Sequence, residues 1–256
     1  MRKRRKAITL ISILCTVLGL SASVYAQETA QKMTGDQEKK SYIVAIDPGH
    51  QGPGQDMTGV EPNAPGSDIM KARIVSGTQG TTTGLAEYEL NLSVALKLQK
   101  ELETRGYRVV MMREDNDINI SNVERAAVAT EENADITIRI HANGSEDASA
   151  CGALMLISSA SNPYVGHLYE DSYDLAQCVL EAYCEATNLQ NDGIMETDTM
   201  TGINWSTMPV TIIEMGFMTN PGDDLYMAAD ENQEIMAFGI ADGIDTYFSQ
   251  KGSTME

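Results

Sequence analysis

The sequence predicts a single α/β domain, built on a mostly parallel, twisted sheet of about six strands with helices on both faces. Apolar strand-like runs alternate with amphipathic helical patterns between residues 41 and 249, and this alternation favours repeated strand–helix units. The strand-like runs are almost continuously apolar, which is typical of strands buried on both sides. No internal repeat or low-complexity tract interrupts the stretch, so one domain is expected.

Five short apolar runs are expected to be strands because they are rich in β-branched and long aliphatic residues. They are residues 42–46 (YIVAI), 107–112 (YRVVMM), 135–141 (DITIRIH), 153–157 (ALMLI) and 210–214 (VTIIE).

Four segments are expected to be helices, at about residues 87–105, 121–132, 169–187 and 234–248. In the first, leucine or valine recurs every four residues from Leu90 to Leu102, and Gly106 marks the end. In the second, Ser121 can cap the helix, and Glu124 completes a capping-box pattern.

The long segment 51–84 breaks the strand–helix rhythm. It is rich in glycine and proline, and it is expected to be an ordered surface loop with room for a short hairpin. Ordered loops of this length tend to carry function.

The N-terminus has the features of an export signal. Five basic residues between Arg2 and Lys6 precede an apolar run that ends in Val24-Tyr25-Ala26, so residues 1–26 are predicted to be a cleaved signal peptide. An uncleaved membrane anchor is the alternative, but the run is short for a bilayer span. A lipoprotein site at Cys15 is disfavoured by the bulky Leu14. Residues 27–40 are expected to form a disordered leader, residues 41–249 the folded domain, and residues 250–256 a tail.

The charge balance excludes several functions. After cleavage the chain keeps 13 Lys and Arg against 37 Asp and Glu, a formal net charge of −24. Such a chain is not expected to bind nucleic acid or an anionic membrane by bulk electrostatics. Cys151, Cys178 and Cys184 remain, too few for a disulfide framework, although one disulfide is possible.

Three predicted strands end on a residue that can bind a metal or move a proton: His50, His141 and Glu214. In open α/β sheets, ligands bind outside the carboxyl ends of the strands, so these residues are expected to converge. Glu87 opens the first long helix and belongs to the same edge. Two histidines and a carboxylate are a usual ligand set for catalytic zinc, and a second carboxylate can serve as the base.

Structural roles are the alternative for each residue alone. A histidine at a strand end is more often structural than a ligand, and a glutamate at a helix start usually complements the helix dipole. Glu214 is harder to explain in this way, because its neighbours are apolar and burying an unpaired carboxylate is costly. His167 has no strand before it and is expected to be a surface residue.

Four sequence motifs favour the metal-site interpretation over the structural one. They are AIDPGHQG, GLAEYELNLSVALKLQKELETRGYRVVMMRE, ERAAVATEENADITIRIHANGS and MPVTIIEMGFMTNPGDD. In this order they resemble the zinc-dependent N-acetylmuramoyl-L-alanine amidases (amidase-3 type) over about residues 42–248. The resemblance implies a phosphorylase/hydrolase-like fold and Zn²⁺ as cofactor. It implies that His50, Glu87 and His141 bind the metal and that Glu214 is catalytic.

Two positions need separate treatment. Glu89 lies close to Glu87, but the family pattern E-x-x-x-N-L begins at Glu87, and two positions on a helix differ by about 200°, so both cannot face one metal. Arg139 stands where many members have serine. It shares a strand face with His141, so it is expected either to orient Glu214 or to hold a substrate carboxylate or carbonyl. An ion pair with an acidic neighbour is the alternative.

The activity implied by the resemblance is hydrolysis of the amide between N-acetylmuramic acid and L-alanine in peptidoglycan. The enzyme is expected to be secreted and extracellular or wall-associated, without a stable membrane anchor, and the 51–84 segment is expected to form one rim of the substrate groove. Two alternatives stay open: a zinc peptidase acting within the stem peptide, and an inactive wall-binding module, which would be expected to lack one of the four residues.

Overall fold

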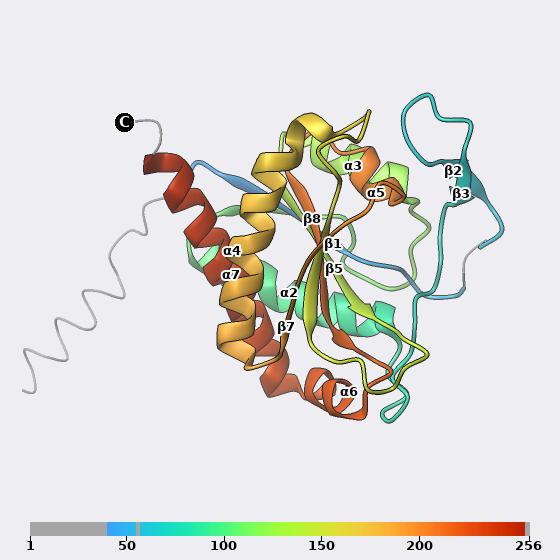
Figure 1. The fold of residues 1–256 in the computed structure, drawn as a ribbon, viewed down its shortest axis with the longest axis vertical. Coiled ribbons are helices and arrows are strands. Elements are labelled where there is room, and N and C mark those ends of the chain that lie inside the picture. Colours follow the sequence, from blue (N-terminus) through green and yellow to red (C-terminus); the bar gives the residue numbers. More distant parts are fainter. Residues whose placement is uncertain (1–39, 55–56, 254–256) are drawn as a thin grey trace, which may run out of the picture. The chain divides into compact units, whose positions relative to one another are not determined.

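The computed structural model describes residues 40–54 and 57–253 (Figure 1). The predicted signal peptide, all of the predicted leader except Lys40, and the last three residues of the predicted tail lie outside the described residues. Among the residues that the structure describes, no helix is both long enough and apolar enough to cross a membrane.

A six-stranded sheet forms the centre of the domain, with strand order β4-β1-β5-β8-β6-β7. Strands β4, β1, β5 and β8 are parallel, whereas β6 is antiparallel to β8 and parallel to β7. The bounds are β1 Ile43–Pro48, β4 Arg108–Met111, β5 Ile136–Asn143, β6 Ala153–Ile157, β7 Asn191–Glu196 and β8 Val210–Phe217. The predicted mostly parallel sheet is therefore confirmed.

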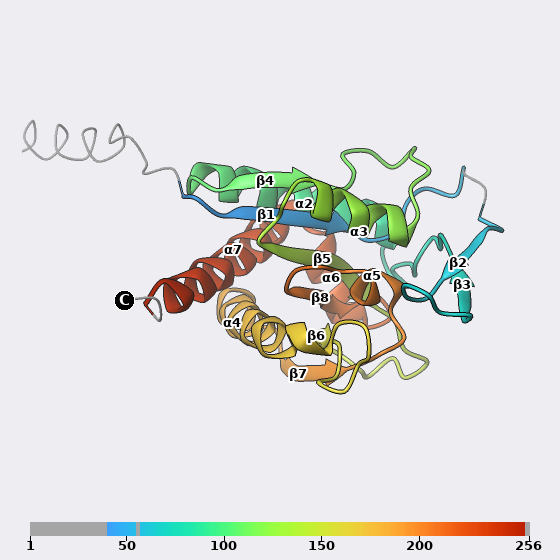
Figure 2. The same cartoon turned by 90° about the horizontal axis from the view of Figure 1, so that it is seen from above.

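Helices cover both faces of this sheet (Figures 1 and 2). The largest apolar core joins one face to α2 (Glu87–Thr104), α4 (Tyr169–Thr187) and α7 (Asp230–Ser253). Two smaller apolar clusters join the other face to α3 (Asn122–Glu131) and α5 (Thr201–Asn204). The remaining helices are η1 (Gly166–Leu168), which leads into α4, and α6 (Pro221–Ala228), which follows β8.

Most predicted elements lie where their sequence signals placed them. Helix α4 has the predicted bounds, α2 ends just before Gly106, whose φ is 89°, and Ser121 and Glu124 form the predicted capping box of α3. Helix α7 begins earlier than predicted and continues into the predicted tail.

Several short elements were not predicted: β7, α5, α6 and η1. Strand β7 (NDGIME) lies at the sheet edge with no fully buried residue, so it lacks the apolar run that marks a buried strand. Helix α5 is a single turn with no periodicity to read.

The 51–84 segment contains the short hairpin for which its length left room. Strands β2 (Val60–Pro62) and β3 (Met70–Ala72) pair antiparallel, and hydrogen bonds attach this hairpin to the domain. The Trp205 indole donates a hydrogen bond to the Pro62 carbonyl at 3.0 Å, and the Glu61 carboxylate accepts one from the Asn122 amide at 3.1 Å. The hairpin is therefore held beside α3 and α5.

Candidate metal centre

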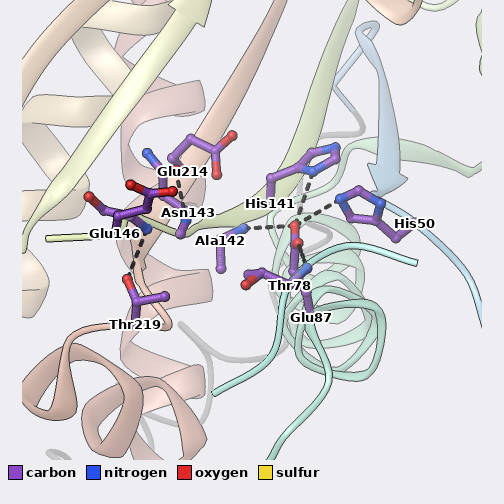
Figure 3. Close-up of a pocket in the computed structure, with 11 residues that line it drawn as sticks. His50, Thr78, Glu87, His141, Ala142, Asn143, Glu146, Glu214 and Thr219 are labelled. Atoms are coloured by element: carbon purple, nitrogen blue, oxygen red, sulfur yellow. Dashed lines mark hydrogen bonds and ion pairs between the residues drawn. The ribbon is translucent and has the colours of Figure 1, made fainter. Parts of the chain in front are cut away.

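Three residues from separate elements meet at the carboxyl edge of the sheet. His50, Glu87 and His141 each offer one ligand atom, and these atoms lie within 4.8 Å of one another. One oxygen of Glu87, Oε1, lies 3.1 Å from His50 Nε2 and 3.2 Å from His141 Nδ1. Figure 3 shows the carboxylate between the two imidazoles. The predicted convergence of these three residues at one edge of the sheet is therefore observed, although β5 continues past His141 to Asn143.

The turn after β1 delivers His50 to this position. His50 has a left-handed backbone, with φ of 61°, and its carbonyl accepts a hydrogen bond from Arg125 Nη2 at 2.8 Å. Its Nδ1 is 2.8 Å from the Val75 carbonyl oxygen, which fixes the ring and leaves Nε2 facing Glu87. A Cβ at Gly49 would lie 2.3 Å from the His141 ring, so the close approach of the two histidines requires glycine there.

Glu87, in the first turn of α2, is held by three groups besides the two histidines. Its Oε2 accepts from the Thr78 amide at 2.8 Å. Its Oε1 accepts from Asn91 Nδ2 and the Ala142 amide, both at 3.2 Å. Glu89 instead is exposed and turns back to the Ala86 amide. The structure therefore brings Glu87, and not Glu89, to the histidines.

The protonation states suit a metal ligand set. Burial opposes ionisation of Glu87, but hydrogen bonds from His141 and His50 outweigh it and hold the pKa of Glu87 far below its usual range. Burial lowers the pKa of His141 to about 4, although its hydrogen bond to Glu87 acts in the opposite direction. His141 Nε2 is buried and has no hydrogen-bond partner among the described residues. An anionic carboxylate beside a neutral imidazole fits a zinc ion.

Glu214 lies on the adjacent strand at the same level. In the parallel β5–β8 pair, Glu214 is the register partner of His141, so both side chains lie on one face of the sheet. Both line a pocket of about 490 Å³ together with His50 and Glu87 (Figure 3). Burial raises the pKa of Glu214 to about 8, and the nearby negative charge of Glu87 adds to the shift.

Arg139 lies one pleat before His141 and is buried. Its Nη2 is 3.0 Å from Asp47 Oδ2 and donates to Asn122 Oδ1 at 3.0 Å. The ion pair with an acidic neighbour, the structural alternative from the sequence, is therefore present. Glu214 is not among the hydrogen-bond or ion-pair partners that the described residues give Arg139.

His167 and the cysteines lie outside the metal centre. His167 is exposed, as expected of a surface residue. The three described cysteines, Cys151, Cys178 and Cys184, are free thiols.

The sequence analysis missed two buried arginines near the site. Arg113 and Arg125 both donate hydrogen bonds to the Pro48 carbonyl and hold the turn that carries His50. Their position after a strand and in a helix gave no signal of burial.

Comparison with known proteins agrees with this geometry. Residues 44–246 match the family described as N-acetylmuramoyl-L-alanine amidase. Among similar proteins, the uncharacterized protein YqiI of Bacillus subtilis is 33% identical, over 68% of this chain and 80% of that one. An N-acetylmuramoyl-L-alanine amidase of Mycobacterium tuberculosis is 25% identical, over 82% of this chain and 88% of that one.

A solved structure extends the likeness to the fold. The crystal structure of the amidase Ami1 from Mycobacterium smegmatis superimposes with a TM-score of 0.75 at 25% identity, covering 83% of this chain and 99% of that one. The family match covers the sheet, the helices on both faces and the four residues His50, Glu87, His141 and Glu214. The chain therefore belongs to the N-acetylmuramoyl-L-alanine amidase family and is an amide hydrolase of that class.

Proposed function

We propose that the protein hydrolyses the amide between N-acetylmuramic acid and L-alanine in peptidoglycan, with zinc held by His50, Glu87 and His141 and with Glu214 as the proton-transferring group. The observation that carries this proposal is the placement of Glu214 beside His141, in register on the neighbouring strand and in the same pocket as all three ligands. The family supplies the amide hydrolase class.

The three ligands have a donor set, two imidazole nitrogens and a carboxylate oxygen, that matches catalytic zinc. When bound, the metal would supply Lewis-acid polarisation of the scissile carbonyl and would lower the pKa of a water molecule. The chain's own part is to hold the ligands rigidly. Asn91 links Glu87 to the turn that carries His50, because its Nδ2 donates both to Glu87 Oε1 and to the Gly49 carbonyl, each at 3.2 Å.

Glu214 has the environment of a group that both takes and gives a proton. As the water oxygen bonds to the carbonyl carbon, Glu214 accepts the proton that the water loses. It then donates this proton to the alanine nitrogen as the carbon–nitrogen bond breaks, which leaves a muramic acid carboxylate and a free amino terminus. A carboxyl group whose pKa is raised to about 8 by burial is matched to such exchange near neutral pH.

The test compares the purified wild type with Glu214→Gln. Zinc content is measured by mass spectrometry, and the products from muramoyl-peptide are analysed for free muramic acid carboxyl and for N-terminal alanine. Retained zinc with turnover reduced at least about 100-fold supports the assignment, since general acid–base catalysis contributes roughly 10²–10⁴-fold. Undiminished turnover in the variant would remove Glu214 from the mechanism.

Product analysis also separates the alternatives. A zinc peptidase would release a new terminus within the stem peptide and leave alanine attached to muramic acid. An inactive wall-binding module would bind muramoyl-peptide without releasing either product.

The proposed site of action is outside the membrane. Export through cleavage after Ala26, proposed from the signal-peptide pattern, would bring the enzyme to its polymeric substrate. Because the chain after cleavage carries a formal net charge of −24, weak retention on anionic walls is expected. Fractionation of cultures should find most activity in the medium. An N-terminal sequence beginning at Met1 would contradict cleavage.

A further inference from the structure

A second cavity of about 300 Å³ lies beside the metal centre. It shares His50 and His141 with the first pocket but is lined on its other sides by the hairpin strand β3, by Asn122 and by the α5 region. The two cavities differ in charge. The first is lined by Glu87, Glu146 and Glu214. The second is lined by two cations, Lys71 and Arg139, and its described lining includes no acidic residue.

Arg139 keeps hydrogen-bonding capacity that its protein partners do not use. Its exposed fraction is 5%, and its Nε has no hydrogen-bond partner among the described residues. Its contacts with Asp47 and Asn122 both involve Nη2. Its partner Asp47 is shared, because Arg125 Nη1 also pairs with that carboxylate. One carboxylate therefore faces two guanidinium groups.

Glycine at position 202 makes room for this guanidinium. A Cβ at Gly202 would lie 0.8 Å from Arg139 Nη1, so Nη1 occupies the space above the first turn of α5. The second acidic neighbour, Glu61, is already engaged by the backbone amides of Asn122 and Val123 at the start of α3. Neither acidic group near Arg139 lines the cavity.

The hairpin brings the second cation to the same cavity. Lys71 is exposed and lies on β3, paired in register with Glu61 of β2. The Trp205–Pro62 hydrogen bond and a second one, from Thr201 Oγ1 to Asn63 Oδ1 at 3.3 Å, hold the hairpin against α5. Lys71 is therefore carried by an anchored hairpin on the rim of this cavity.

We propose that this cavity, between Lys71 and Arg139, is a subsite for a carboxylate of the stem peptide. The inference rests on the proposed function, since it places the substrate across the metal centre. In a muramoyl-peptide the sugar's carboxyl group is consumed in the scissile amide, so free carboxylates belong to the peptide. The cationic cavity thus takes the peptide, and the pocket around Glu146 takes the uncharged sugar.

The test measures binding separately from turnover. Two synthetic muramoyl-tripeptides are compared, one with every peptide carboxylate free and one with every carboxylate converted to the primary amide. Their dissociation constants are measured by calorimetry with zinc-loaded Glu214→Gln protein. The acid should bind about tenfold more tightly than the amide, the order expected from a charge-assisted hydrogen bond.

Variants in the same background assign the effect. Lys71→Ala and Gly202→Ala should reduce the preference for the acid toward equality, while Lys100→Ala, an exposed lysine on α2 with the same charge change, should retain it. Thermal unfolding confirms that each variant is folded. Equal binding of acid and amide, or a preference untouched by Lys71→Ala and Gly202→Ala, overturns the subsite. Hydrolysis by the wild type, measured in parallel, decides the proposed function independently.

Discussion

Replacement of Arg125 by methionine should destabilise the domain and weaken its metal centre together. The buried guanidinium of Arg125 pairs with Asp47 and donates to three further groups: the Pro48 carbonyl at 2.7 Å, the His50 carbonyl at 2.8 Å and Gln51 Oε1 at 2.9 Å. Methionine keeps an unbranched apolar side chain of similar reach, so the change removes mainly the charge and the four contacts.

The expected loss of folding free energy follows from the contacts that each partner of Arg125 retains in the variant. Asp47 keeps Arg139, and the Pro48 carbonyl keeps Arg113. The His50 carbonyl and Gln51 Oε1 lose the donors that hold them. Breaking a buried ion pair from one side costs about 3–5 kcal/mol. The domain stays folded in water only if its total stability, typically about 5–15 kcal/mol, exceeds this loss.

Urea unfolding of metal-free protein measures the cost, because bound metal would add its own stabilisation. Arg108→Met is the matched control: Arg108 and Glu132 pair at the surface with side chains 50% and 46% exposed, so its loss should cost less than about 1 kcal/mol. Competition with a chelator then gives zinc affinity, which should fall about tenfold or more in Arg125→Met, as for other residues that orient ligands. A cost equal to that of Arg108→Met, or unchanged zinc affinity, would refute the reasoning.

Three further changes test single features. Gly49→Ala places a Cβ 2.3 Å from the His141 ring, so bound zinc per protein should fall sharply, whereas Gly54→Ala, whose Cβ meets nothing nearer than 3.9 Å, should leave it unchanged. Ser121→Ala removes the α3 cap and should lower the free energy of unfolding by about 1 kcal/mol; an unshifted urea midpoint would argue against that cap. Burial opposes ionisation of Asp47, but its two arginine partners hold its pKa far below the usual range. The stability from this pair is therefore present above about pH 3.9 and is lost as the pH falls further, so Asp47→Asn should flatten the acid limb of the stability profile, and an equally steep limb would contradict the shift.

The convergence of the metal residues was readable from the sequence because parallel strands share one carboxyl edge. His50 and His141 each follow a buried apolar run, and strand order does not alter which edge they reach. Glu87 was chosen over Glu89 by helix geometry and by the family pattern, and the structure places Glu87 at the histidines. The catalytic role of Glu214 stays a prediction until the variant is measured.

The residues that surround the site could not be predicted, because their contacts depend on the register between strands. Local sequence patterns do not encode that register. Asp47 looks like part of a turn in the sequence, yet it is the register partner of Arg139 in the β1–β5 pair. That pairing, between residues far apart in the chain, converts a turn aspartate into the counter-ion of two arginines. Strand β7 and helix α5 were missed for the same reason, since contacts with distant elements, and not their own periodicity, stabilise them.

The sheet's pleat explains how one site can present opposite charges on its two sides. Residues 139 and 141 lie on the same face of β5, one pleat apart, so the cation and the metal ligand follow each other along the strand. Glu214 stands level with His141 on β8, beyond the ligand rather than beside Arg139. A substrate lying across His141 therefore meets a carboxyl group on one side and a guanidinium group on the other. The whole chain carries a formal net charge of −19. Such local separation is what would let an anionic peptide approach the metal centre, because the cationic cavity offsets the surrounding negative field where the peptide carboxylate would bind.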